Sequence, residues 1–155
     1  MHRKWLVAHD LSQEAERALG RAAEQLTALG GGELVLAYVH APVSTGFGID
    51  LGATNTFQDV DRTLESEAKE RLSGISRELG QRFPTLTLRT LVEIGHPAEH
   101  LVEMAHRESV DQIVLGSHGR RGLQRFFLGS VAERVLRLAD RPVLVVKAPH
   151  PAPAS

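Results

Sequence analysis

The stretch KWLVAHDLSQEAERALGRAAEQLTALGGGELVLAYVH, residues 4–40, predicts a strand, a helix and a second strand in close succession. Its opening apolar run is followed by Asp10 and Ser12, residue types that commonly begin helices. Apolar residues then recur at helical spacing up to the glycines at 30–32, which end the helix because glycine readily adopts a positive φ. Residues 33–40 form a buried-type strand. A strand–helix–strand unit this short indicates a parallel sheet.

The middle of the chain continues this alternation. Residues 41–56 contain turn residues without a clear period, which is typical of a long loop. A second helix is expected next, and its buried side carries Val60, Leu64, Ala68, Leu72, Ile75 and Leu79. Residues 85–94 alternate between apolar and polar side chains, as an edge strand does, and Pro97 is well placed at the first position of a third helix.

The last third of the chain predicts a strand over 111–116, a helix over 130–138 and a strand over 142–147. The apolar side of that helix is expected to carry Val131, Val135 and Leu138. Five strands alternating with four helices predict a doubly wound, Rossmann-like α/β fold, an open sheet of five parallel strands in the expected order 3-2-1-4-5. Ligands of such sheets bind beyond the carboxyl ends of the strands, where the strand order reverses. Asp10 and Gly116 are therefore expected to wall that crevice.

Length and composition indicate one domain. The chain has 155 residues, of which 42% are apolar and 24% charged, close to the average of globular proteins. We expect the domain to cover residues 1–147, and the proline-rich residues 148–155 to form a disordered tail. Cysteine is absent, which excludes disulfides, thiolate metal sites and a cysteine nucleophile.

The charge balance excludes two classes of partner. Lysine and arginine total 18 against 19 acidic residues, and a net charge of -1 argues against a dedicated binder of nucleic acid or of a membrane surface. No apolar run reaches the roughly 20 residues that span a bilayer. The apolar run at the N-terminus is too short for a secretory signal. A cytoplasmic location is therefore expected.

The glycines of LGSHGRRGLQRFFLGSVAERVL, residues 115–136, have an unusual spacing. Gly116 and Gly119 follow the fourth strand, where glycine allows the backbone to approach a ligand closely. Gly129 and Ser130 stand at a helix N-terminus, whose free N–H groups and dipole favour an anion. The alternative is that these glycines only shape a loop and that the serine only caps the helix.

Charge supports a phosphate ligand at this position. Arg120 and Arg121 lie between the two pairs of glycines and offer cations suited to phosphate. The stretch is not a Walker loop, because no Lys-Ser or Lys-Thr pair follows a glycine. It is not a dinucleotide fingerprint either, because that motif follows the first strand, where this chain has AHDLSQEA.

The pattern G-x-x-G, nine residues, then G-[ST] resembles the nucleotide-binding signature of the universal stress protein family, and Gly116, Gly119, Gly129 and Ser130 match it. Further stretches similar to that family are WLVAHDLSQEA at the start, LAYVHAP (36–42) and GHPAEHLVEMA (95–105). The resemblance runs from about residue 4 to residue 147. It implies an adenine nucleotide as ligand, namely ATP or else ADP or AMP, together with Mg²⁺.

The resemblance also implies roles for individual residues. In ATP-binding members an aspartate after the first strand contacts the nucleoside, and Asp10 holds that position. The valine that lines the adenine pocket corresponds to Val39. The positions beside the base and ribose correspond to Leu115 and Gly116, and those around the phosphates to Gly119, Gly129, Ser130 and Val131. Arg120 is added to these candidate nucleotide-binding residues because its positive charge suits a phosphate. The chain departs from the family at His9, where relatives commonly have valine or threonine, and this bulkier residue would narrow the adenine end.

Histidines are the remaining candidate ligands. His96 and His100 are four residues apart at a helix start, yet His96 is expected to help cap that helix, so no metal site is predicted. His9, His40 and His118 all follow strand ends on the ligand side of the sheet. They could meet near the phosphates, but we favour the interpretation that they are solvated loop residues.

Catalysis has little support in the sequence. Ser130 has no evident base, and Asp10 alone is a thin basis for phosphoryl transfer, so no catalytic residue is predicted. The resemblance implies at most slow ATP hydrolysis or self-phosphorylation.

The last predicted strand indicates a second copy of the chain as a partner. PVLVVK, residues 142–147, carries no charge before Lys147, and an uncharged edge strand needs cover. We therefore expect it to pair antiparallel with its copy in a two-fold homodimer. The alternative is that it is a strand inside the core.

Taken with the resemblance, the sequence predicts an ATP-binding regulatory module whose nucleotide sets its choice of a protein partner in the stress response. Residues 41–56 and 117–128 are the expected switch segments. Two alternatives stay open, a slow ATP-hydrolysing enzyme and an interaction scaffold without nucleotide.

Overall fold

A computed structural model of the chain describes residues 2–43, 54–118 and 128–149. The elements in these segments are β1 (Lys4–Ala8), α1 (Gln13–Ala28), β2 (Gly32–His40), α2 (Thr54–Arg82), β3 (Leu86–Ile94), α3 (Pro97–Arg107), β4 (Gln112–Gly116), α4 (Ser130–Leu138) and β5 (Val143–Val146). Most of the expected tail lies outside the described residues, so its disorder stays a prediction.

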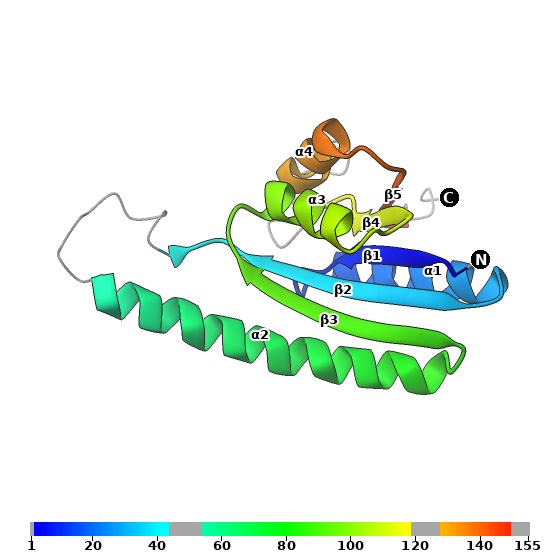
Figure 1. The fold of residues 1–155 in the computed structure, drawn as a ribbon, viewed down its shortest axis with the longest axis horizontal. Coiled ribbons are helices and arrows are strands. Elements are labelled where there is room, and N and C mark those ends of the chain that lie inside the picture. The colour runs from blue at the N-terminus through cyan, green and yellow to red at the C-terminus, as the bar shows by residue number, and fades with distance from the viewer. Residues whose placement is uncertain (1, 44–53, 119–127, 150–155) are drawn as a thin grey trace, which may run out of the picture.

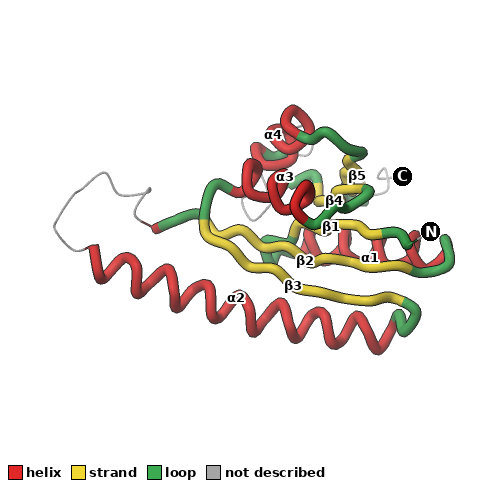
Figure 2. Tube along the Cα trace, viewed as in Figure 1, coloured by secondary structure: helices red, strands yellow, loops and turns green. Residues whose placement is uncertain are grey.

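The five strands form one parallel sheet in the order β3-β2-β1-β4-β5. Helices α1 and α2 cover one face of the sheet, and α3 and α4 cover the other (Figures 1 and 2). The chain runs outward from β1 to β3 and then returns through α3 to β4 on the other side of β1. The predicted doubly wound α/β fold and its strand order are confirmed.

Strand alternation divides the core between the two faces. In β1, Trp5 and Val7 are buried against the α1–α2 layer, whereas Leu6 is buried against the α3–α4 layer. Successive side chains of a strand point to opposite faces, so the next residue in the first series is His9. A side chain there is directed towards α1 and α2.

The start of α2 differs from the prediction. The helix begins at Thr54 and so includes the last residues of the predicted loop. Val60 was expected on the buried side, but its exposed fraction is 41%, whereas Ala68 and Leu72 are buried as predicted. Figure 1 shows the physical reason, because the first turns of α2 project beyond the carboxyl ends of β2 and β3, where there is no sheet to pack against.

The buried face of α4 also differs. Val131 and Leu138 were expected to be buried, but their exposed fractions are 37% and 43%. Val135 is buried as predicted, and the residue buried beside it in the core on the α3–α4 side is Ala132. Because α4 carries apolar residues on more than one side, helical spacing did not distinguish the face that the tertiary structure buries.

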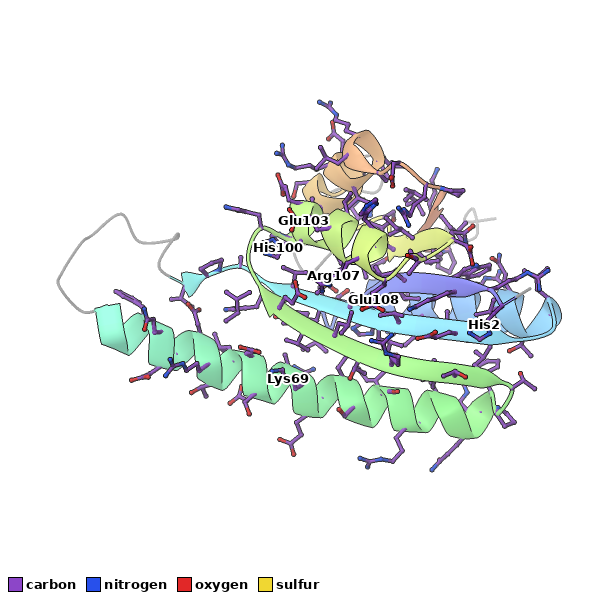
Figure 3. The ribbon with its side chains drawn as sticks, in the orientation of Figure 1. His2, Lys69, His100, Glu103, Arg107 and Glu108 are labelled. Atoms are coloured by element: carbon purple, nitrogen blue, oxygen red, sulfur yellow. The ribbon has the colours of Figure 1, made fainter. Side chains whose placement is uncertain are left out.

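The two edge strands differ in polarity. In β3, Arg89 binds Glu108 at 2.8 Å and Glu33 at 3.3 Å. Lys4 of β1 also reaches Glu108, at 2.9 Å, so a network of charges joins three strands to the end of α3, where Figure 3 labels Glu108. In β5 every residue is half-buried and apolar. The sequence therefore predicted correctly that residues 85–94 form a charged edge.

Candidate functional site

Strands β1 and β4 separate at their carboxyl ends. The last residues that they pair with each other are Val7 and Val114. Beyond these, Ala8 pairs with β2 and Leu115 pairs with β5. The strand order reverses between β1 and β4, which is where open α/β sheets bind ligands.

A hollow of about 480 Å³ lies between the N-terminal ends of α3 and α4, and we call it the α3–α4 hollow. Its lining consists of His96, Pro97, Ala98, Glu99, Ser130, Val131 and Arg134. Arg134 forms an ion pair with Glu99 and lowers the pKa of that carboxyl. The sequence predicted the α4 side of the hollow but not the α3 side, which is formed by residues of the stretch GHPAEHLVEMA.

The start of α4 fixes which amides face outward. Gly129 is the N-cap, and its N–H donates to the carbonyl of Ser117 at 2.7 Å. That amide is therefore occupied and does not add to an anion site. Ser130 is the first helical residue rather than the cap, and the first-turn N–H groups of Ser130 and Val131 have no acceptor within the helix.

Gly116 packs closely against the first turn of α1. A Cβ at this position would lie 3.2 Å from the Cβ of Glu14 and 3.2 Å from its carbonyl oxygen. Such contacts are tight, so the glycine lets the first turn of α1 approach the end of β4 closely. This close packing is a structural reason for glycine at this position, in addition to the approach of a ligand that the sequence predicts.

Asp10 is held at the start of α1. Asp10 is the second residue after β1, and its Oδ1 accepts the N–H of Ser12 at 3.0 Å. Ser12 in turn caps the helix, since its Oγ accepts the N–H of Ala15 at 3.2 Å, as predicted for a helix start. The Asp10 carboxylate therefore stands on an ordered turn at the carboxyl edge of the sheet.

The sequence model of the universal stress protein family matches residues 1–147. The chain belongs to the universal stress protein family. It is 32% identical over 158 residues to Universal stress protein MJ0577 of Methanocaldococcus jannaschii, covering 95% of this chain and 96% of the relative. A solved structure of MJ0577 superposes with a TM-score of 0.84 at 30% identity, over 97% of this chain and 99% of that chain.

More distant universal stress proteins share the fold. One, solved in complex with cAMP, has a TM-score of 0.63 at 22% identity and covers 96% of this chain and 98% of its own. Another, At3g01520 of Arabidopsis thaliana with AMP bound, has a TM-score of 0.63 at 17% identity and covers 97% of both chains. At these identities the likeness establishes the fold alone.

Two further candidates for the site of this universal stress protein face the α3–α4 layer. Val39, near the end of β2, is half-buried and packs against the core on that side. Leu115 has an exposed fraction of 4% and packs in the same core, so it offers main-chain groups rather than a side chain to a ligand. Gly119 and Arg120, with Arg121, lie outside the described residues.

His9 is not a solvated loop residue, contrary to the interpretation from sequence. Its exposed fraction is 2%, and burial lowers the pKa of its imidazole to about 4. Its Nδ1 accepts the N–H of Leu11 at 3.0 Å, and its Nε2 lies 3.7 Å from a carboxylate oxygen of Glu16 in α1. The ring therefore lies on the side of the sheet opposite to Val39.

The other strand-end histidines stay near their own strands. The Nε2 of His40 lies 3.4 Å from Asp61 of α2, and the Nδ1 of His118 lies 3.0 Å from the Oγ of Ser117. Across residues 2–43, 54–118 and 128–149, no three His, Cys, Asp or Glu side chains are placed to hold a metal ion together.

The expected capping by His96 is wrong in one respect. His96 occupies the N-cap position of α3, with Pro97 in the first turn as predicted, but its side chain makes no capping hydrogen bond to the described part of the chain. The ring of His100 lies over Gly95 beside the carboxyl ends of β2 and β3, where Figure 3 labels it. None of the described helices is both long enough and apolar enough to cross a membrane.

Proposed function

We propose that this universal stress protein binds an adenine nucleotide, with ATP and Mg²⁺ as the principal ligand, at the carboxyl edge of β1 and β4. One observation carries the proposal. The described members of the glycine signature stand at the end of β4 and at the start of α4, and one of them, Ser130, lines a hollow of about 480 Å³ together with Val131. That volume is within the range of small-molecule sites. Two universal stress proteins of the same fold are described with AMP and with cAMP bound, which supports an adenine ligand.

Each candidate residue offers a distinct contact in this proposal. Asp10 would accept hydrogen bonds from nucleoside hydroxyls, and Val39 would line the base. The main chain at Leu115 and Gly116 would lie beside the ribose. The phosphates would meet the hydroxyl of Ser130 and the amides at the first turn of α4, where the helix dipole favours an anion. The contributions of Gly119 and Arg120 stay predictions.

The charges around the α3–α4 hollow are compatible with an anion. Glu99 would repel a phosphate, but Arg134 is paired with it and compensates its charge. On the α4 side, the first-turn amides of Ser130 and Val131 belong to residues that line the hollow and have no acceptor within the helix. Bound Mg²⁺ would neutralise further phosphate charge.

We further propose that nucleotide occupancy sets the choice of a protein partner in the stress response. A ligand that orders neighbouring segments couples binding to recognition. The predicted switch segments, residues 41–56 and 117–128, lie largely outside the described residues. The expected cytoplasmic location likewise stays a prediction.

We also propose a homodimer through β5. No strand among the described ones lies beyond it, so the outer backbone groups of Val143–Val146 are available for pairing. Antiparallel pairing with the same strand of a second copy would cover this apolar edge and satisfy two-fold symmetry.

The nucleotide proposal is tested on protein purified without added ATP. Mass spectrometry should detect a co-purified adenylate, and titration calorimetry with ATP, ADP and AMP, with and without Mg²⁺, should give saturable binding. Gly119→Val should abolish the binding. Gly74→Val is the matched control, because a Cβ there would meet no described atom within 4 Å. Flat titrations with all three adenylates would contradict the proposal.

A further inference from the structure

His9 brings a polar ring into the layer between the sheet and α1–α2. Its side chain is fully buried, and its own N–H donates to the carbonyl of Ala37 in β2 at 2.8 Å. A buried imidazole loses the hydrogen bonds that water would give it, so a polar ring is retained in a core when a specific partner compensates for that loss.

The partner of the ring is a strained residue in the same turn. Leu11 has a φ of 65°, a left-handed conformation that is unfavourable for a residue with a Cβ. Its N–H donates to Nδ1 of His9 at 3.0 Å, and its side chain packs against the core of the α1–α2 layer. The imidazole and this packing together hold Leu11 in place.

Asp10 stands between these two residues, so the turn determines where its carboxylate lies. His9 accepts the N–H of Leu11, and Asp10 accepts the N–H of Ser12 at 3.0 Å. Two successive side chains therefore each accept the amide two residues ahead. The main chain is fixed on both sides of Asp10, immediately before the first turn of α1.

The same geometry assigns the tautomer of the ring. Because Nδ1 accepts a hydrogen bond, the proton lies on Nε2. Nε2 finds no hydrogen-bond partner among the described residues, and the nearest carboxylate oxygen, on Glu16, is 3.7 Å away. The charged groups that face the ring are Glu16 from α1, Arg71 from α2 and Asp10 in its own turn.

We propose that His9 is a positioning residue of the nucleotide site, whose neutral Nδ1 holds the Leu11 turn and thereby places Asp10. This inference rests on the proposed nucleotide function. An ion pair with Glu16 does not explain the ring, because the buried imidazole is neutral near neutral pH. An apolar side chain would fill the same space, but it would leave the N–H of Leu11 without its acceptor.

The test compares three substitutions in the full-length protein. His9→Asn keeps an acceptor, because an asparagine oxygen can accept the N–H two residues ahead. His9→Leu fills the space without an acceptor, and His9→Val is a second such variant in case the first does not fold. The control is Thr27→Val, which removes a buried hydroxyl that has no described partner near the far end of α1.

Two readouts separate the turn from the ligand. Amide hydrogen exchange of Leu11, measured by NMR without nucleotide, should be about tenfold faster in His9→Leu or His9→Val than in the wild type. It should stay near the wild-type rate in His9→Asn and in the control. Titration calorimetry with ATP should follow the same order, with a Kd about fivefold weaker in the variants without an acceptor and restored in His9→Asn.

Each other result would overturn the inference in a recognisable way. Unchanged exchange at Leu11 would mean that His9 does not hold the turn. Faster exchange with an unchanged ATP Kd would mean that the turn does not position Asp10, while the proposed function would stand. Absence of ATP binding in the wild type, whatever the exchange rates, would overturn the proposed function and the positioning role with it.

Discussion

His9, Trp5 and Val7 face the same side of the sheet, and this placement gives the histidine a measurable effect on stability. The pKa of His9 falls from 6.5 to about 4 in the folded chain, mainly because of burial. The smaller contributions of two nearby charges oppose each other, because Asp10 raises the pKa and Arg71 lowers it. Between these two values the unfolded chain binds a proton that the folded chain does not. The free energy of unfolding therefore falls as the pH falls through this window, and the contribution is fully present above it.

We expect the wild type to lose about 2 kcal/mol more unfolding free energy than His9→Leu between about pH 7.5 and about pH 5. Urea denaturation followed by the fluorescence of Trp5, the one tryptophan and a core residue, provides the measurement. Replacing the exposed His2 by glutamine is the control and should leave the wild-type difference intact. Equal losses in the wild type and His9→Leu would show that His9 titrates normally.

Single residues at the site also show how much a pattern can indicate. Gly116 was predicted at the end of a strand, and Gly129 and Ser130 at the start of a helix, and the structure has them there. These positions could be predicted because the limits of strands and helices follow from local sequence. It could not show that the amide of Gly129 is bound to Ser117, or that Gly116 is packed against Glu14. Both contacts join residues that are not neighbours in the chain.

At the scale of elements, the end of α1 shows how local chemistry sets a boundary. The N–H of Gly31 donates to the carbonyl of Leu26 at 2.9 Å, and the N–H of Gly30 donates to that of Thr27 at 3.0 Å. This is the hydrogen-bond pattern of a Schellman motif, with φ values of 98° at Gly30 and 95° at Gly31. The helix stop expected at 30–32 is confirmed.

The two glycines should respond differently to alanine. A Cβ at Gly30 would meet no described atom within 4 Å, so Gly30→Ala should cost only backbone strain, about 1 kcal/mol. At Gly31 a Cβ would lie 2.8 Å from the carbonyl oxygen of Thr85, so Gly31→Ala should cost at least about 2 kcal/mol. Urea denaturation of both variants measures the difference. Equal losses would show that the approach of residue 85 does not constrain this turn.

The positions of strands and helices were predicted better than the sides of the helices that are buried. Hydrophobic period and glycine or proline at the ends are local signals, and they identified each strand and helix. On α4 the prediction was right for Val135 but wrong for Val131 and Leu138, because these two residues fit a helical stripe with Val135 as well as Ala132 does. The exposure of Val60 depends on how far α2 extends beyond the sheet, which its own sequence does not encode.

At the scale of the whole molecule, the sheet has two unlike edges. The β3 edge carries charges, among them Arg89, which is bound to Glu33 of β2 and to Glu108 just after α3. The β5 edge is apolar and half-buried throughout. An uncharged edge strand is a template for further pairing, so the asymmetry directs association to β5.

The wild type should therefore be a dimer at low micromolar concentration by size-exclusion chromatography with light scattering. Val145→Lys should shift it to a monomer, because a charge on β5 opposes edge-to-edge pairing. Thr87→Lys places the same charge on the exposed β3 edge and should leave the dimer intact. Far-UV circular dichroism confirms that the variants are folded. A monomeric wild type would contradict the dimer proposal.

The order of strands and helices, the parallel sheet and the family could all be predicted from the chain's residues, since hydrophobic period, helix ends and the glycine signature are properties of neighbouring residues. Three features became visible only in the folded chain: His9 is buried and bonded to a strained Leu11, the amide of Gly129 is occupied, and α3 completes the hollow beside α4. The physical reason is that burial and hydrogen-bond partners depend on which distant segments the fold brings together.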